Sequence, residues 1–399
     1  MDLAAFDYDL PEPAIAQTPI EPRDRARLLV DRGADRAPEH RTVADLPSLV
    51  EPGDVLVLNT TRVLPARLLL RKGTGGAVEV LLLERRDAGH WDALVKPSRR
   101  VPPGTVLHAG DDLDVELRGE GTESGTRQVV LHLHGPGERH GPMPRGRPAM
   151  AAGSGEGATS AGDWRTTAVP GAASEADPAM AHEEARRRDE LTVLARYGVV
   201  PLPPYITAPL ADPERYQTVY ADQAESVAAP TAGLHLTPAV LDACRAAGAE
   251  IAPVELAVGL GTFRPMTAGK VEDHEMHAER YRVPPATLEA CRSARRVVAV
   301  GTTAVRALES AAQTGQLDGR TELFIHRPYD WQLVDVLLTN FHLPRSSLLV
   351  LIDAFVGGRW RDLYGLALAE GYRFLSFGDA MLLSRAVHGA DAAGAEVGS

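Results

Sequence analysis

The sequence predicts an α/β protein with a second, smaller domain that is rich in β-strands. Its 399 residues exceed what a single core usually organises, which favours two domains. Apolar runs such as Val55–Leu58 and Arg296–Val300 lead into polar turns, which is typical of buried strands in an α/β sheet. Residues 66–134 instead contain short strand-like pieces separated by Gly, Pro and Asp, a pattern that indicates a small β-barrel or sandwich.

Composition narrows the class of protein. Hydrophobic residues make up 44% and charged residues 24% of the chain, as in soluble globular proteins, and no apolar run could span a bilayer. The acidic amino terminus lacks the features of a signal peptide, and two cysteines predict neither a disulfide framework nor a zinc site. We therefore expect a cytoplasmic protein. A net charge of −12 disfavours broad, non-specific attraction to nucleic acid but permits a local basic face.

The expected elements follow from apolar patterning and turn chemistry. Gly198 ends a predicted helix, Thr237-Pro238 reads as an N-cap with a first-position proline, and Gly301 opens another helix. Helices are predicted at 182–197, 239–249, 304–312 and from Ser346 or Ser347 to Val356. Strands are predicted at 27–30, 55–58, 67–70, 77–84, 91–95, 105–107, 113–117, 128–134, 250–258, 296–300, 323–326 and 333–338.

Residues 135–181 differ in composition from the rest of the chain. They are rich in Gly, Ala, Pro and Ser and nearly lack branched aliphatic residues. Such a segment buries too little apolar surface to offset the entropy of ordering, so we predict a flexible insertion without chemistry.

Several turns combine glycine, hydroxyl, amide and imidazole groups. The stretch 226–237, SVAAPTAGLHLT, places an amide-rich turn before a helix, and Gly301-Thr302-Thr303 does the same. Helix amino ends of this kind suit anions. The alternative interpretation is an ordinary connector in which His235 is a hydrogen-bonded structural histidine.

Two apparent motifs do not fit their usual functions. The GLGTFRP stretch, 259–265, has Arg264 where a dinucleotide fingerprint requires glycine. DHEMHAE, 273–279, places His274 and His277 three residues apart, whereas a zincin motif requires four. We therefore expect no metal, and interpret the second stretch as an acid/base cluster.

Taken together and in order, the motifs closely resemble the S-adenosylmethionine:tRNA ribosyltransferase-isomerase family of the queuosine pathway. The resemblance covers nearly the whole chain outside 135–181 and rests on NTTRVLPARL, PLPPYI, YQTVY, VAAPTAGLH, VGLGTFRP, DHEMHAE, VAVGTTAVRALES, LLTNFHLP and FGDAM. It implies a large α/β domain built from residues 1–65 and 191–399, with a β-barrel domain inserted at 66–190. It also implies transfer and isomerisation of the ribosyl group of S-adenosylmethionine, a co-substrate, to 7-aminomethyl-7-deazaguanine in tRNA. The products are epoxyqueuosine-tRNA, adenine and methionine.

This chemistry sets requirements for a site. A base removes a proton next to the sulfonium, the attacking amine is neutral, adenine needs a proton as it leaves, and the methionine carboxylate needs donors. The acid/base candidates are His235, His274, His277, Glu279, His342 and Asp379. Residues expected to position the substrate are Thr231, Gly233, Thr302, Thr303, Arg306, Asn340 and Asn59. The candidate tRNA contacts are Arg62, Arg67, Lys96 and Arg100.

Two positions depart from the family pattern. The family pattern before the glycine turn resembles LHVG, and this chain has Ala257 in place of the histidine. The family phrase that resembles FIYPG is replaced here by Phe324-Ile325-His326-Arg327-Pro328. These changes leave open a paralogue with a non-tRNA acceptor, or a non-catalytic RNA- or nucleoside-binding relative. We expect a monomer, and a dimer is equally compatible with the composition.

Overall fold

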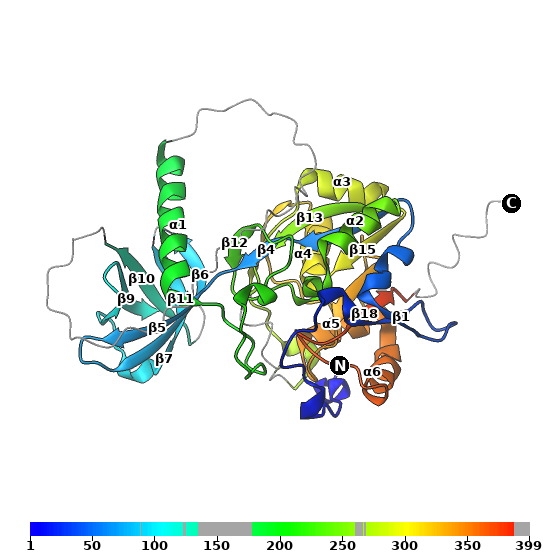
Figure 1. Ribbon diagram of the computed structural model, residues 1–399, viewed down its shortest axis with the longest axis horizontal. Helices are drawn as coiled ribbons and strands as arrows, with labels where there is room; N and C mark the ends of the chain where they lie inside the picture. The colour runs from blue at the N-terminus through cyan, green and yellow to red at the C-terminus, as the bar shows by residue number, and fades with distance from the viewer. Residues whose placement is uncertain (88, 123–124, 135–177, 260–265, 267–268, 387–399) are drawn as a thin grey trace. The chain divides into compact units, whose positions relative to one another are not determined.

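In a computed structural model the chain divides into two compact units (Figure 1). Residues 1–87, 89–122, 125–134, 178–259, 266 and 269–386 are described. The larger unit comprises Met1–Val63 and Leu202–Ser399, and the smaller one comprises Leu64–Pro201. An α/β unit with an inserted β-barrel is therefore confirmed. No helix within the described ranges is long and apolar enough to cross a membrane.

The larger unit is built on a mixed β-sheet. Across the described residues the strand order is β16-β14-β13-β3-β15-β17-β18-β1-β2, and β13, β3, β15 and β17 are mutually parallel. The strands are β1 (Arg27–Asp31), β2 (Glu39–Thr42), β3 (Asp54–Asn59), β13 (Glu250–Leu256), β14 (Glu279–Arg282), β15 (Arg296–Val300), β16 (Asp318–Thr321), β17 (Val336–Asn340) and β18 (Ala380–Ser384). A short parallel pair, β4 (Thr61–Val63) and β12 (Gln223–Ser226), lies outside this sheet.

The continuous apolar strands are explained by burial on both faces. In β3, Val55 and Val57 belong to one core cluster, while Leu56 and Leu58 belong to the other. The first cluster includes residues of α3 (Pro285–Ser293), α4 (Thr302–Thr314), α5 (Ser347–Val356) and α6 (Trp360–Ala369). The second includes residues of α2 (Pro238–Ala246).

One predicted strand is wrong. The run 323–326 has no strand structure, and the strand in this region is β16, Asp318–Thr321. Ile325 is buried in the core and the Phe324 ring lies 5.3 Å from that of His274, so this short apolar run is buried as a loop. Apolar character alone does not specify strand pairing.

The smaller unit is a closed antiparallel barrel, which settles the choice between barrel and sandwich. Its strand order is β5-β6-β7-β10-β9-β8, and pairing of β5 with β8 closes the cylinder. Alternate residues such as Leu68 and Leu70 are buried. The strands are β5 (Arg67–Lys72), β6 (Ala77–Asp87), β7 (His90–Lys96), β8 (Val106–Ala109), β9 (Leu113–Glu120) and β10 (Arg127–Leu133), with β11 (Gly198–Val199) added beside β5.

Helix α1 (Pro178–Tyr197) packs on the barrel and belongs wholly to the smaller unit. Arg85 anchors it by donating to Glu183 at 2.6 Å and to the buried Glu190 at 2.9 Å. The first four residues of the helix, 178–181, fall within the predicted insertion, and residues 135–177 lie outside the described part of the chain.

Candidate active site

Polar groups collect where the parallel strands of the larger unit end. Asn59 closes β3, Gly301 follows β15 and Asn340 closes β17, all at the carboxyl edge of the sheet. The short helix η7 (Thr231–His235) lies at the same edge: a methyl group placed on Gly301 would lie 3.6 Å from the Ala232 Cβ. This edge is where ligands bind in open α/β sheets.

Asn340 joins the two ends of η7. Its Oδ1 accepts from the Thr231 hydroxyl at 2.9 Å, and its Nδ2 lies 2.9 Å from His235 Nε2 and donates to the Leu375 carbonyl at 3.2 Å. Because the amide nitrogen can only donate, the imidazole accepts at Nε2 and carries its proton on Nδ1. The structure thus brings together three predicted site residues in one buried network.

His235 is held neutral. Burial, helped by the nearby positive charges of Arg23, Arg373 and Arg215, lowers the pKa of His235 to about 4. A neutral imidazole is therefore the form present near pH 7.

Arg23, which the sequence analysis did not select, contacts the same candidate site. Its guanidinium donates to the carbonyls of Gln217 at 2.7 Å and Leu234 at 3.4 Å, which ties η7 to the preceding segment. Burial, with Arg215 beside it, lowers the pKa of Arg23 to about 10. The only sequence signal was the run of charged residues at 23–27, and such a run is more typical of a solvated turn.

His342 has a separate environment. Its Nε2 lies 3.0 Å from the Thr339 hydroxyl, and its backbone N–H donates to the buried Tyr364 hydroxyl at 3.0 Å. Burial lowers the pKa of His342 to about 3, so this ring is also neutral. No hydrogen bond joins it to His235 among the described residues, and its contacts are those of a core residue.

Glu279 and Arg306 form a buried ion pair. The second Glu279 oxygen accepts from the Gly259 N–H at 2.9 Å, and Arg306 Nε donates to the Leu323 carbonyl at 3.0 Å. Arg306 therefore connects α4 to β14 and to the loop after β16. Its charge is already balanced within the protein.

Asp379 and Asn59 are also engaged by the backbone. The Asp379 carboxylate accepts from the N–H groups of Arg27 and Arg373, both at 2.8 Å, and burial raises its pKa. Asn59 donates to the Leu256 carbonyl at 3.0 Å and accepts from the Leu256 N–H at 3.1 Å. Both side chains hold strand ends in place.

The acid/base cluster at 273–279 is divided by the fold. Glu279 is buried, His274 is half-buried with its pKa lowered by burial and by His277, and His277 is exposed. The described residues contain no group of three or more His, Cys, Asp or Glu side chains that could hold a metal.

The predicted tRNA contacts differ in how they are paired. Arg62 is bound to Glu214, and Arg67 donates to Glu79 at 3.0 Å. Lys96 ends β7 and Arg100 lies within the loop between β7 and β8; both are exposed, and neither has an ion-pair partner in the described part of the chain.

Buried hydroxyl groups without partners mark the same edge of the larger unit. Thr303 Oγ1, Tyr220 OH and Thr218 Oγ1 are buried and lack a hydrogen bond within the described residues. Tyr220 and Thr218 lie against Gly233, where a side chain could not fit: a Cβ would lie 1.9 Å from the tyrosine hydroxyl. The YQTVY phrase contained both residues, but their isolation emerges only in three dimensions.

The two departures from the family pattern, at Ala257 and at Arg327, differ in their structural surroundings. The Ala257 backbone N–H pairs with the Arg280 carbonyl at 2.9 Å, and its methyl side chain supplies no donor or acceptor. Arg327 donates to both oxygens of the buried Asp353, at 2.6 and 2.9 Å, so this additional cation is neutralised.

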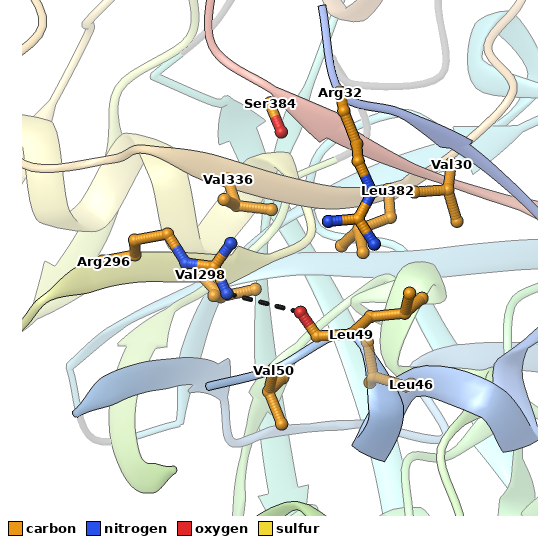
Figure 2. Close-up of a pocket in the computed structure, with 10 residues that line it drawn as sticks. All are labelled: Val30, Arg32, Leu46, Leu49, Val50, Arg296, Val298, Val336, Leu382 and Ser384. Carbon is orange, nitrogen blue, oxygen red and sulfur yellow. Dashed lines mark hydrogen bonds between the residues drawn. The ribbon is translucent and has the colours of Figure 1, made fainter. Parts of the chain in front are cut away.

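A hollow lies at the opposite edge of the sheet (Figure 2). It is lined by residues at the carboxyl ends of β1 and β18 and at the amino ends of β15 and β17, with Arg296 donating to the Leu49 carbonyl at 3.3 Å. Its lining is mainly aliphatic and includes none of the predicted site residues.

The fold is that of an α/β protein with an inserted β-barrel, and the candidate site lies at the carboxyl ends of its parallel strands. The family model described as queuosine biosynthesis protein matches residues 3–154 and 163–383, and the chain belongs to this family. Similar curated proteins named S-adenosylmethionine:tRNA ribosyltransferase-isomerase come from Moorella thermoacetica and Thermus thermophilus. The first is 43% identical and the second 45%; each covers 96% of this chain, and the matches span 100% and 99% of the relatives. A crystal structure of an S-adenosylmethionine tRNA ribosyltransferase from Thermotoga maritima is 32% identical, with a TM-score of 0.47, and the match covers 95% of this chain and 99% of that one.

Proposed function

We propose that this chain is an enzyme that transfers and isomerises the ribosyl group of S-adenosylmethionine onto 7-aminomethyl-7-deazaguanine in tRNA. The products are epoxyqueuosine-tRNA, adenine and methionine. Family membership and the names of relatives that match over nearly their whole length support this reaction. The structural observation that carries it is the buried network of Thr231, Asn340 and His235 at the carboxyl edge of the sheet.

In this proposal His235 acts as a neutral imidazole. Asn340 occupies Nε2, so the ring presents its Nδ1–H to an acceptor atom of the substrate. Its low pKa keeps the ring uncharged beside the sulfonium, which avoids placing two positive charges together. Arg23 and Asn340 position the ring.

The proton transfers need groups that are accessible to the substrate. Glu279 and Asp379 are already engaged by Arg306 and by backbone N–H groups, which favours positioning roles for both. His274 and His277 retain imidazoles at or near the surface and are the better candidates to take the proton next to the sulfonium and to protonate adenine. Their assignment stays a prediction.

The tRNA would be held through phosphates by the exposed Lys96 and Arg100 of the barrel. No metal enters this scheme, and a cytoplasmic location stays a prediction.

Adenine release from S-adenosylmethionine tests the proposal. It is measured with precursor tRNA, with free 7-aminomethyl-7-deazaguanine and without acceptor. We expect release with the tRNA, and a fall in turnover of about 100-fold or more in His235→Gln and Asn340→Ala. Release with the free base alone would indicate another acceptor, and absence of release from folded protein would refute the enzyme assignment.

A further inference from the structure

The amino end of α4 differs from those of α2 and α5. Helix α2 is capped by the Thr237 hydroxyl, which accepts from Val240 N–H at 3.2 Å, and α5 is capped by Ser346, which accepts from Leu349 N–H at 3.2 Å. Helix α4 follows Gly301 and, like α3 and α6, has no side-chain cap among the described residues. The first N–H groups of a helix have no acceptor within the helix.

This uncapped end is buried. Thr302, Thr303 and Ala304 are 6%, 9% and 0% exposed, so bulk water does not replace the missing cap. The Thr303 hydroxyl, in the same turn, is buried and has no partner in the described part of the chain. Several donors therefore meet at one protected place without an acceptor, an arrangement that is costly unless a ligand supplies one.

A small anion would supply the missing acceptor. The positive end of the helix dipole favours negative charge, and Arg306, one turn further on, is already neutralised by Glu279. A tRNA phosphate belongs to a chain too bulky to enter so buried a position. A carboxylate at the end of a flexible small molecule fits it.

This end of α4 also adjoins the His235 network. Gly301, at φ +90°, allows the chain to turn from β15 into the helix, and Ala232 of η7 lies against it. Thr231, the residue before Ala232, is the one that donates to Asn340. An anion at α4 and a reacting group at His235 can therefore belong to one ligand.

We propose that the amino end of α4 binds the carboxylate of the methionyl part of S-adenosylmethionine, through its backbone N–H groups and the Thr303 hydroxyl. This subsite rests on the proposed function, since it takes S-adenosylmethionine as the ligand.

The test compares two ligands and two variants of the full chain. Binding of S-adenosylmethionine and of its decarboxylated analogue is measured by calorimetry, and binding of tRNA by filter binding, for the wild type, Thr303→Val and Thr303→Ser. We expect the wild type to bind the analogue more weakly than the parent. Thr303→Val should lose roughly tenfold in affinity for the parent and leave binding of the analogue unchanged, whereas Thr303→Ser should retain wild-type binding.

The outcomes separate the two proposals. Equal loss for both ligands in Thr303→Val, or no loss for either, overturns the carboxylate subsite while leaving the proposed function in place. Weaker tRNA binding with unchanged S-adenosylmethionine binding assigns the site to a phosphate and overturns the subsite as well. Failure of the folded wild type to bind S-adenosylmethionine overturns the proposed function itself. Thermal unfolding of each variant confirms that the compared proteins are folded.

Discussion

Two sets of buried polar groups lie at the carboxyl edge of the sheet in the larger unit. One set is satisfied by the protein: Glu279 is paired with Arg306, and Asp379 accepts two backbone N–H groups. The other set, which includes Thr303 and Tyr220, has no partner within the described residues. Polar groups of the first set stabilise the fold, whereas those of the second cost stability unless a ligand or water binds them. Polar groups that are already hydrogen-bonded or ion-paired therefore form the structural frame of the proposed site, and the buried hydroxyl groups without partners are its candidate ligand contacts.

Breaking the ion pair should produce the largest effect. Arg306→Met leaves the Glu279 carboxylate buried without its cation, and we expect a loss of about 3–5 kcal/mol in the free energy of unfolding. Urea denaturation measures this loss. Arg62→Met, which breaks the more exposed pair with Glu214, is the matched control and should cost at most about 1 kcal/mol. Similar losses of unfolding free energy in the two variants would show that the Arg306 ion pair is not especially important for stability.

Acid should destabilise the protein through its buried histidines. The unfolded state takes up a proton on His235 as pH falls below 6.5, whereas the folded state does not until about pH 4. The unfolded state therefore binds more protons in this window, and stability is lost as pH falls from about 6.5 to about 4, by about 3 kcal/mol for such a shift.

His235→Gln should remove this part of the pH dependence, as measured by urea denaturation across the same window. Thr231→Val removes a hydrogen bond from the network without removing the titrating group, so it should lower stability at every pH and keep the slope. An unchanged slope in His235→Gln would show that His235 is not the buried neutral group described here.

Two buried tyrosine hydroxyl groups, one with a partner and one without, should differ in their effect on stability. The Tyr364 hydroxyl accepts from the His342 N–H, whereas the Tyr220 hydroxyl has no partner in the described part of the chain. Tyr364→Phe should cost about 1–3 kcal/mol because it leaves a buried N–H unpaired, and Tyr220→Phe should be neutral or slightly stabilising. Thermal unfolding distinguishes them. An equal loss of stability in Tyr220→Phe would show that the Tyr220 hydroxyl stabilises the fold.

The sequence predicted the layers of the fold well and the bonding of its polar residues poorly. Apolar runs such as Val55–Leu58 and turn residues such as Gly301 indicate strands and their ends through local chemistry. Whether a polar residue is satisfied depends on partners far along the chain: Asp379 is held by Arg27, 352 residues away. For the same reason the sequence could not show that Arg306, which is expected to position the substrate, is paired with Glu279. Tyr220 was visible only as part of a motif, because its isolation follows from tertiary packing.

The smallest expected effect is on tRNA binding by surface cations of the barrel, where a paired arginine can again be compared with unpaired cations. Arg67 is held by Glu79, while Lys96 and Arg100 have no ion-pair partner in the described ranges. If the unpaired cations contact tRNA phosphates, replacing Arg100 by Met should weaken tRNA binding modestly and reduce the slope of log K against log salt by about 0.7–0.9. Arg67→Met should change the slope less, because Arg67 is already paired with Glu79 and is not expected to neutralise a phosphate. Filter binding across a salt series measures both slopes. A larger change for Arg67 than for Arg100 would show that pairing within the protein does not decide which surface cations meet the tRNA.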